Sequence, residues 1–143
     1  MEIKSIFLCD SASPHPDGTF SLLRGGIDNW NVQSFPTQIS FSFVVILELL
    51  STEVGRMHIA ELDIIDADGN RVLPQGKIPF SIPVKINVTR YKWNLVGSLI
   101  VPIPKAGKYS LQVGVDGHNL SSAEFQTVQA AQPPQLPPGG GIA

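Results

Sequence analysis

The chain has 143 residues, of which 43% are hydrophobic and 15% are charged, and its formal net charge is −2. This composition excludes a disordered chain and a generally basic nucleic-acid-binding protein, so nucleic acid is an unlikely partner. A single cysteine, Cys9, excludes an internal disulfide, and the length suits one domain with its own core. The N-terminus lacks the apolar run of a signal peptide, and the apolar stretch 41–50 is too short for a membrane helix. We therefore expect a cytoplasmic protein without a membrane segment.

Turn residues divide the first half of the chain into short strands. Twelve prolines and thirteen glycines leave little room for helices. Strands are expected at 3–9, 19–24 and 40–50. The last of these is apolar on both faces, which predicts a central strand. Gly25-Gly26 predicts a bulge or a close crossing, and residues 27–35 are expected to run along the surface.

The second half of the chain continues with segments in which apolar and polar residues alternate. Strands are expected at 56–66, 71–73, 82–89, 95–101 and 107–115, and from the Asp116-Gly117 turn to Val128. The closing hairpin has the clearest pattern, because its alternation meets an Asp-Gly pair that tolerates positive φ. Residues 74–83 contain three prolines, which predicts an irregular edge of a sheet.

About seven to nine strands at this spacing predict an all-β fold, an immunoglobulin-like antiparallel β-sandwich. Residues 1–128 are expected to form this domain. Residues 129–143 are rich in proline and glycine and have almost no apolar pattern. They are predicted to form a flexible, polyproline-like tail.

The N-terminal residues resemble those of a known family. Its members open with a leucine-cysteine-aspartate-x-alanine run, an Asp-Gly turn and a glycine-rich step. The similar segments here are Phe7-Leu8-Cys9-Asp10-Ser11-Ala12, Asp17-Gly18-Thr19-Phe20 and Gly25-Gly26-Ile27-Asp28. This family of small bacterial proteins is known only as a domain of unknown function, and the similarity extends loosely to the closing hairpin. The resemblance implies a β-sandwich in a bacterial cytoplasm, and it brings no activity, ligand or catalytic residue.

Two aromatic clusters carry the best functional signal. No nucleophile, base or ligand set has the spacing of a catalytic site, so we predict no catalytic residue, metal or cofactor. Rings among polar residues are typical of binding surfaces. The candidate binding residues are Asp28 with Trp30, and Arg90, Tyr91, Lys92 and Trp93. The alternative for both tryptophans is packing between the sheets or at the ends of the sandwich.

We therefore expect a non-catalytic binding module whose unknown partner is a protein, contacted through loops, sheet edges or the tail. Two alternatives remain open. A carbohydrate-binding module would use an exposed tryptophan. A metal-dependent enzyme would need a cluster such as Asp10, His15, Asp116 and His118 to converge. The run from Asp66 to Asn70 resembles half of a calcium loop, but the position of the last ligand is Gln75, so the run indicates a hairpin turn.

Overall fold

The computed structural model describes residues 1–131, which form nine strands and one short 3-10 helix. The strands are β1 Glu2–Pro14, β2 Phe20–Gly25, β3 Asn29–Val32, β4 Thr37–Leu50, β5 Met57–Asp66, β6 Gly76–Ser81, β7 Arg90–Ile103, β8 Gly107–Val115 and β9 His118–Gln129, and the 3-10 helix η1 is Ser51–Glu53. No helix in the described part of the chain is long and apolar enough to cross a membrane. The all-β prediction is confirmed.

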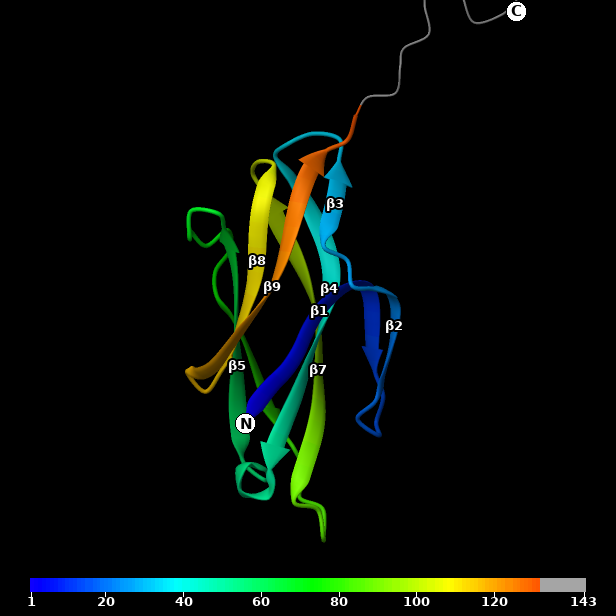
Figure 1. The fold of residues 1–143 in the computed structure, drawn as a ribbon, viewed down its shortest axis with the longest axis vertical. Coiled ribbons are helices and arrows are strands. Elements are labelled where there is room, and N and C mark those ends of the chain that lie inside the picture. Colours follow the sequence, from blue (N-terminus) through cyan, green and yellow to red (C-terminus); the bar gives the residue numbers. More distant parts are fainter. Residues whose placement is uncertain (132–143) are drawn as a thin grey trace, which may run out of the picture.

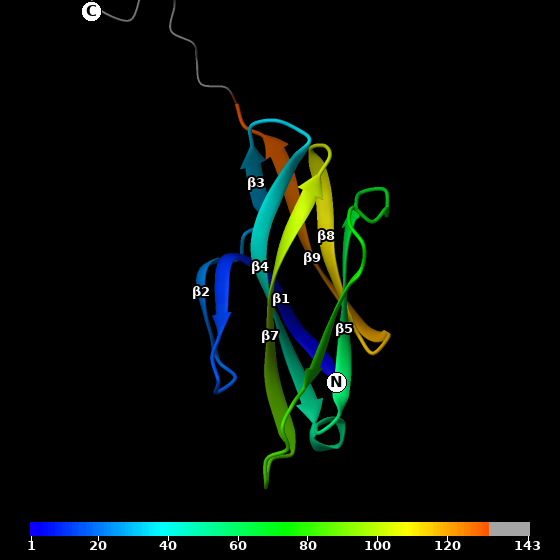
Figure 2. The ribbon, with the colours of Figure 1, turned by 180° about the vertical axis from the view of Figure 1, so that it is seen from behind.

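The strands form two sheets that pack face to face (Figures 1 and 2). The first sheet has four strands in the order β2-β1-β4-β7, and the second has five in the order β3-β9-β8-β5-β6. As predicted, the strand that contains residues 40–50 is central, because β4 pairs with β1 and β7. The expectation of a wholly antiparallel sandwich is wrong at one pair, since β3 runs parallel to β9.

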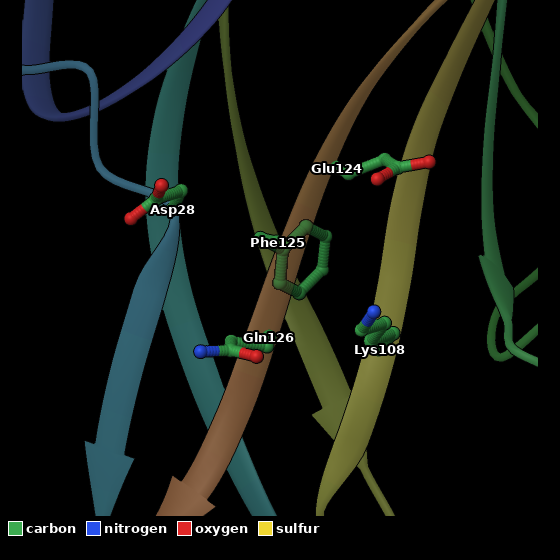
Figure 3. Close-up of a pocket in the computed structure, with 5 residues that line it drawn as sticks. All are labelled: Asp28, Lys108, Glu124, Phe125 and Gln126. Atoms are coloured by element: carbon green, nitrogen blue, oxygen red, sulfur yellow. The ribbon is translucent and has the colours of Figure 1, made fainter.

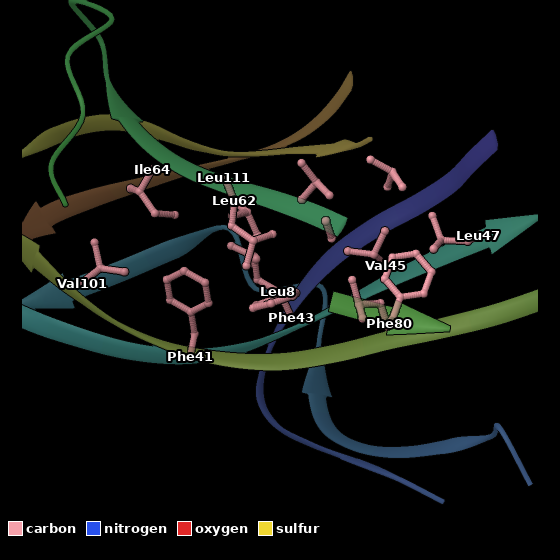
Figure 4. Close-up of a cluster of buried hydrophobic side chains, with 14 of the residues drawn as sticks. Leu8, Phe41, Phe43, Val45, Leu47, Leu62, Ile64, Phe80, Val101 and Leu111 are labelled. Carbon is pink, nitrogen blue, oxygen red and sulfur yellow. The ribbon is translucent and has the colours of Figure 1, made fainter. Parts of the chain in front are cut away.

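The core lies between the two sheets (Figure 4). Alternate side chains of each strand point into this core. The buried cluster includes Phe41, Phe43, Val45 and Leu47 of β4 together with Leu111 of β8. Gly97 of β7 lies opposite Phe43 in the register. A Cβ atom at Gly97 would lie 2.4 Å from the Phe43 ring, so the absent side chain makes room for that ring.

A hairpin covers the outer face of the four-stranded sheet. This flap, residues 10–25, consists of the second half of β1 and β2, and Figure 4 shows it on the side of β4 and β7 opposite the core. Asn94 Nδ2 donates to the Gly18 carbonyl at 2.8 Å, and the Phe7 and Phe20 rings lie 6.1 Å apart. Cys9 and Val44 are fully buried outside the main core cluster. The flap therefore folds over the outer face of β4 and β7 while it stays joined to the same sheet through β1.

The structure corrects several predicted boundaries. Residues 71–73 form only a bridge from Arg71 to Ile65, and residues 82–89 form a loop instead of an edge strand. Conversely, β6 forms across residues 76–81 in spite of Pro79, as its edge position allows. Strand β9 continues to Gln129, and Ala130 N donates to the Val32 carbonyl at 2.7 Å. Most of the predicted tail, from residue 132, lies outside the described residues.

Candidate functional site

The structure separates the four residues of the predicted Arg90–Trp93 cluster. They open β7, and strand alternation turns Tyr91 and Trp93 toward the core and Arg90 and Lys92 toward solvent. Tyr91 is buried, and Trp93 is half-buried and packs against the core. Arg90 Nη1 lies 3.1 Å from Glu48 Oε1 of the neighbouring strand. The aromatic and cationic groups therefore do not form one surface.

Trp30 also packs inward. Its ring centroid lies 5.4 Å from that of Phe41 and 5.3 Å from that of Phe125, so Trp30 joins the two sheets at the open side of β3. The backbone carbonyl of Asp28 accepts from Gln126 N at 2.9 Å. Half-buried and packed on the core, neither Trp30 nor Trp93 offers the exposed planar strip that a carbohydrate-binding module requires.

The Asp28 side chain lies beside a shallow hollow of about 250 Å³ over β9 and β8 (Figure 3). Its lining residues are Asp28, Lys108, Glu124, Phe125 and Gln126. Two carboxylates and one ammonium group meet there, so the hollow has no single sign of charge. It lies away from Arg90 and Trp93, and the two predicted clusters form two separate places on the molecule.

Exposed apolar side chains gather at one end of the sandwich. This loop end comprises loops 51–56 and 82–89, at the bottom of Figure 1, the 116–117 turn, which lies higher at the side of β5, and the strand residues next to them. Among the described residues, all the large exposed hydrophobic side chains except Leu23 and Ile100 lie here: Leu50, Met57, Ile59, Val84, Ile86 and Leu120. Ile86 is 90% exposed. Exposed apolar clusters of this kind mark interaction surfaces.

Polar bonds hold the two larger loops in place. The Tyr91 hydroxyl donates to the Lys85 carbonyl at 3.0 Å and accepts from Lys85 N at 2.9 Å. Gly55 N donates to the Ile82 carbonyl at 2.9 Å, and Ser51 N donates to the Thr89 carbonyl at 3.0 Å. Ile82 is itself buried in the core. Loop 82–89 thus presents Val84 and Ile86 from an anchored base.

A buried histidine supports the loop end from below. His58 is 1% exposed, and its Nδ1 lies 2.5 Å from Asp116 Oδ2. Its Nε2 lies 2.5 Å from the Glu53 carbonyl oxygen. Asp116 also accepts from Ile59 N at 2.9 Å, and the Glu53 carboxylate accepts from Leu50 N at 3.1 Å. His58 therefore ties loop 51–56 to the 116–117 turn.

Two carboxyl groups of this support have lowered pKa values. Burial raises the pKa of Asp116, but the hydrogen bonds from His58 and Ile59 N outweigh burial, and the net pKa lies below the usual 3.8. Burial likewise raises the pKa of Glu53, and hydrogen bonds from the Met1 amine and Leu50 N bring it below the usual 4.5. Both carboxylates are therefore ionised at neutral pH.

The charges exposed at the loop end are largely cationic. Arg56 and Lys85 are exposed, and neither forms an ion pair with any residue in the range 1–131. The nearby acids are engaged, because Asp116 holds His58 and Glu48 holds Arg90. Arg56 and Lys85 therefore add positive charge beside the exposed aliphatic side chains of the loop end.

The residues of the predicted metal cluster do not converge. Asp10 lies 3.4 Å from Arg24 in the flap, whereas Asp116 holds His58 at the loop end. Within the described residues, no group of three or more His, Cys, Asp or Glu side chains is placed to hold a metal ion. Asp66 Oδ1 accepts from Asp68 N and Asn70 N, as expected for a hairpin turn.

Sequence reasoning missed the loop end. The sequence predicts a strand at 82–89, which contains Val84 and Ile86, and none of the predicted sites includes His58. One signal was available for His58: it shares a strand face with Ala60, Leu62 and Ile64, which places a titratable side chain in the core. The bond to Asp116 left no sequence signal, since it joins residues that are 58 positions apart.

The fold defines an all-β domain of two packed sheets, and exposed apolar side chains gather at its loop end. The chain belongs to a family described as "Family of unknown function (DUF6941)", whose model matches residues 4–128. This match confirms the resemblance to an uncharacterised domain family and covers nearly all of the described residues. No curated protein matches the sequence.

Proposed function

We propose that this domain is a non-catalytic protein-binding module and that its loop end is the binding surface. The exposure of Val84 and Ile86 on an anchored loop carries the proposal. Burying these side chains against a partner removes apolar area from water. Because Tyr91 and His58 hold the loops in the free protein, binding orders few additional groups.

Two finer features belong to the same proposal. The fold is immunoglobulin-like: Greek-key sandwiches of that class present several loops at one end. Here loops 51–56 and 82–89 share one end, and His58 connects the 116–117 turn to loop 51–56. The protein functions in a bacterial cytoplasm, a location supported by the unpaired Cys9 and by the N-terminal resemblance.

Site-specific photocrosslinking in cells of the source organism tests the binding surface. A photoreactive amino acid replaces Ile86 in one variant and Leu23 in a control, because Leu23 is also highly exposed but lies on the flap. We expect crosslinks to one or a few discrete proteins at position 86 and none of these at position 23. Equal crosslinking at both positions, or none at position 86, contradicts the proposal.

The identified partner then allows a quantitative test with purified proteins. Val84→Ser and Ile86→Ser remove exposed apolar groups without altering the core. Each is expected to weaken binding by about 2 kcal/mol, as for a central interface residue. Leu23→Ser is the matched control and should bind like the unsubstituted protein. Unchanged affinity in both loop variants would remove loop 82–89 from the interface.

A further inference from the structure

The four edge strands of the two sheets differ in how well they are protected. Edge strands expose unpaired backbone groups, and proteins shield them with short length, charges, prolines or bulges. Strand β3 has four residues, β2 has six and carries Arg24 at positive φ, and β6 has six and contains Pro79 and Lys77. Strand β7 has 14 residues and pairs only with β4.

The middle of β7 lacks every one of these protections. Residues 93–101 contain neither a charged residue nor a proline. The pairing with β4 runs from Thr37 and Ile103 to Leu50 and Arg90 without a register shift, so no bulge turns the edge away. No backbone hydrogen bond outside the strand pairs involves residues 93–101 within the described chain. This stretch is an open template for a further strand.

Apolar side chains along this edge are incompletely covered. Trp93 and Leu99 face the core but stay half-buried, and Ile100 on the outer face is 67% exposed. A strand added at this edge would complete the cover of all three. The partly exposed Trp93 thus has a structural explanation independent of ligand binding.

We propose that the β7 edge pairs with the β7 edge of a second copy of this chain, antiparallel and around a two-fold axis. A two-fold axis perpendicular to the sheet places side chains of the same face opposite one another. Centred on Gly97, it sets Trp93 opposite Val101 and Leu95 opposite Leu99. The pairing joins the two four-stranded sheets into one continuous sheet of eight strands.

Charge supports self-pairing. The cations of β7, Arg90 and Lys92, lie at one end of the strand, and the other end is the uncharged stretch Val101–Ile103. Antiparallel pairing centred on Gly97 sets Lys92 opposite Pro102 and Arg90 opposite Pro104 of the second copy, so Arg90 and Lys92 of one copy do not meet those of the other. Lys105, the nearest cation at the other end, lies 3.8 Å from Asp68. The loop end stays free, and this inference is therefore independent of the proposed partner surface.

Analytical ultracentrifugation across a concentration series tests the proposal. The unsubstituted chain should form a dimer of twice the 15.4 kDa chain mass. Ile100→Lys places a charge on the edge and should raise the dimer dissociation constant at least tenfold. Leu23→Lys is the matched control, since Leu23 is 69% and Ile100 is 67% exposed, and it should leave the dimer intact. Circular dichroism verifies that both variants fold.

Amide hydrogen exchange gives a readout that needs no variant. Exchange of residues 93–101 should slow as the protein concentration rises, while exchange in β6 stays constant. A chain that remains monomeric at several hundred micromolar overturns the proposal. So does a dimer that is equally sensitive to Leu23→Lys, or one without added protection in β7. If exchange in β7 slows only when an extended peptide of another protein is added, that peptide and not a second copy pairs with the edge, and the proposal is wrong.

Discussion

Asp116 combines a turn conformation with a tertiary bond. Its φ of 53° is one that Asp adopts more readily than most residues, and Gly117 follows at 76°. The Asp-Gly pair alone predicted this turn. The bond to His58 was not predictable, because it depends on β5 and β8 being neighbours in the sheet. At the residue scale, sequence shows backbone requirements better than it shows side-chain partners.

The Asp116→Asn variant measures how much the charge of Asp116 contributes to its interaction with His58. Asn keeps the turn conformation and an acceptor for Ile59 N, but it weakens the bond to buried His58. We expect the free energy of unfolding to fall by about 1 to 3 kcal/mol at pH 7 in urea titrations. Asp68→Asn, in an exposed Asp-Gly turn, is the control and should change stability by less than about 0.5 kcal/mol.

The same variant shows how the contribution of the Asp116 charge to the free energy of unfolding depends on pH. The folded-state pKa of Asp116 lies below the usual 3.8, so its stabilisation is complete above that value and is lost as the pH falls through the lowered pKa. The difference between the unsubstituted protein and Asp116→Asn should therefore shrink between pH 5 and pH 2, by about the whole charge contribution. A constant difference over this range would contradict the assignment.

Position 97 requires glycine because the Phe43 ring occupies the space of a side chain, and not because of its backbone conformation. An added Cβ would lie 2.4 Å from the buried Phe43 ring, whereas at Gly76, also in a strand, the nearest atom would be 3.7 Å away. We expect Gly97→Ala to lower the midpoint of thermal unfolding by the equivalent of about 1 to 3 kcal/mol. Gly76→Ala should leave the midpoint nearly unchanged. Equal effects would show that glycine content, not packing, sets the cost.

At the scale of elements, a strand or loop was predictable when the residues that determine it lie within its own segment. Strands β5 and β8 were located because their alternation is complete within each segment, and β4 because its run is apolar on both faces. Loop 82–89 was not, because the hydroxyl of Tyr91, on the next strand, organises it through Lys85. The predicted binding residues at 90–93 lie on both faces of β7, and alternation applied to this segment would have separated its rings from its cations.

Tyr91→Phe tests how loop 82–89 is held. The substitution keeps the buried ring but removes both bonds to Lys85. We expect faster trypsin cleavage after Lys85, because local opening of the loop becomes less costly by about 1 kcal/mol, or roughly fivefold in rate. Cleavage after Lys77 in β6 is the internal control and should not change. Equal acceleration at both sites would indicate global destabilisation instead.

At the scale of the whole molecule, truncation tests the predicted boundary between the domain and the tail. Removing residues 132–143 should leave the thermal midpoint unchanged within about 1 °C, because their sequence has no pattern that joins a core. Removing residues 129–143 also deletes the Ala130 bond to Val32 and the Gln129 bond to Gln33. This shorter chain should melt several degrees lower, as for a loss of about 1 kcal/mol.

The flap gives this protein an internal probe of its own motion. Cys9 is fully buried where the flap meets the sheet, and burial raises the pKa of its thiol. A protonated, covered thiol reacts slowly with a disulfide reagent such as DTNB, so labelling requires opening. Asn94→Ala removes the bond that holds Gly18 and should accelerate labelling several-fold, by about 1 kcal/mol of opening free energy. The single cysteine thereby reports flap opening without an attached label.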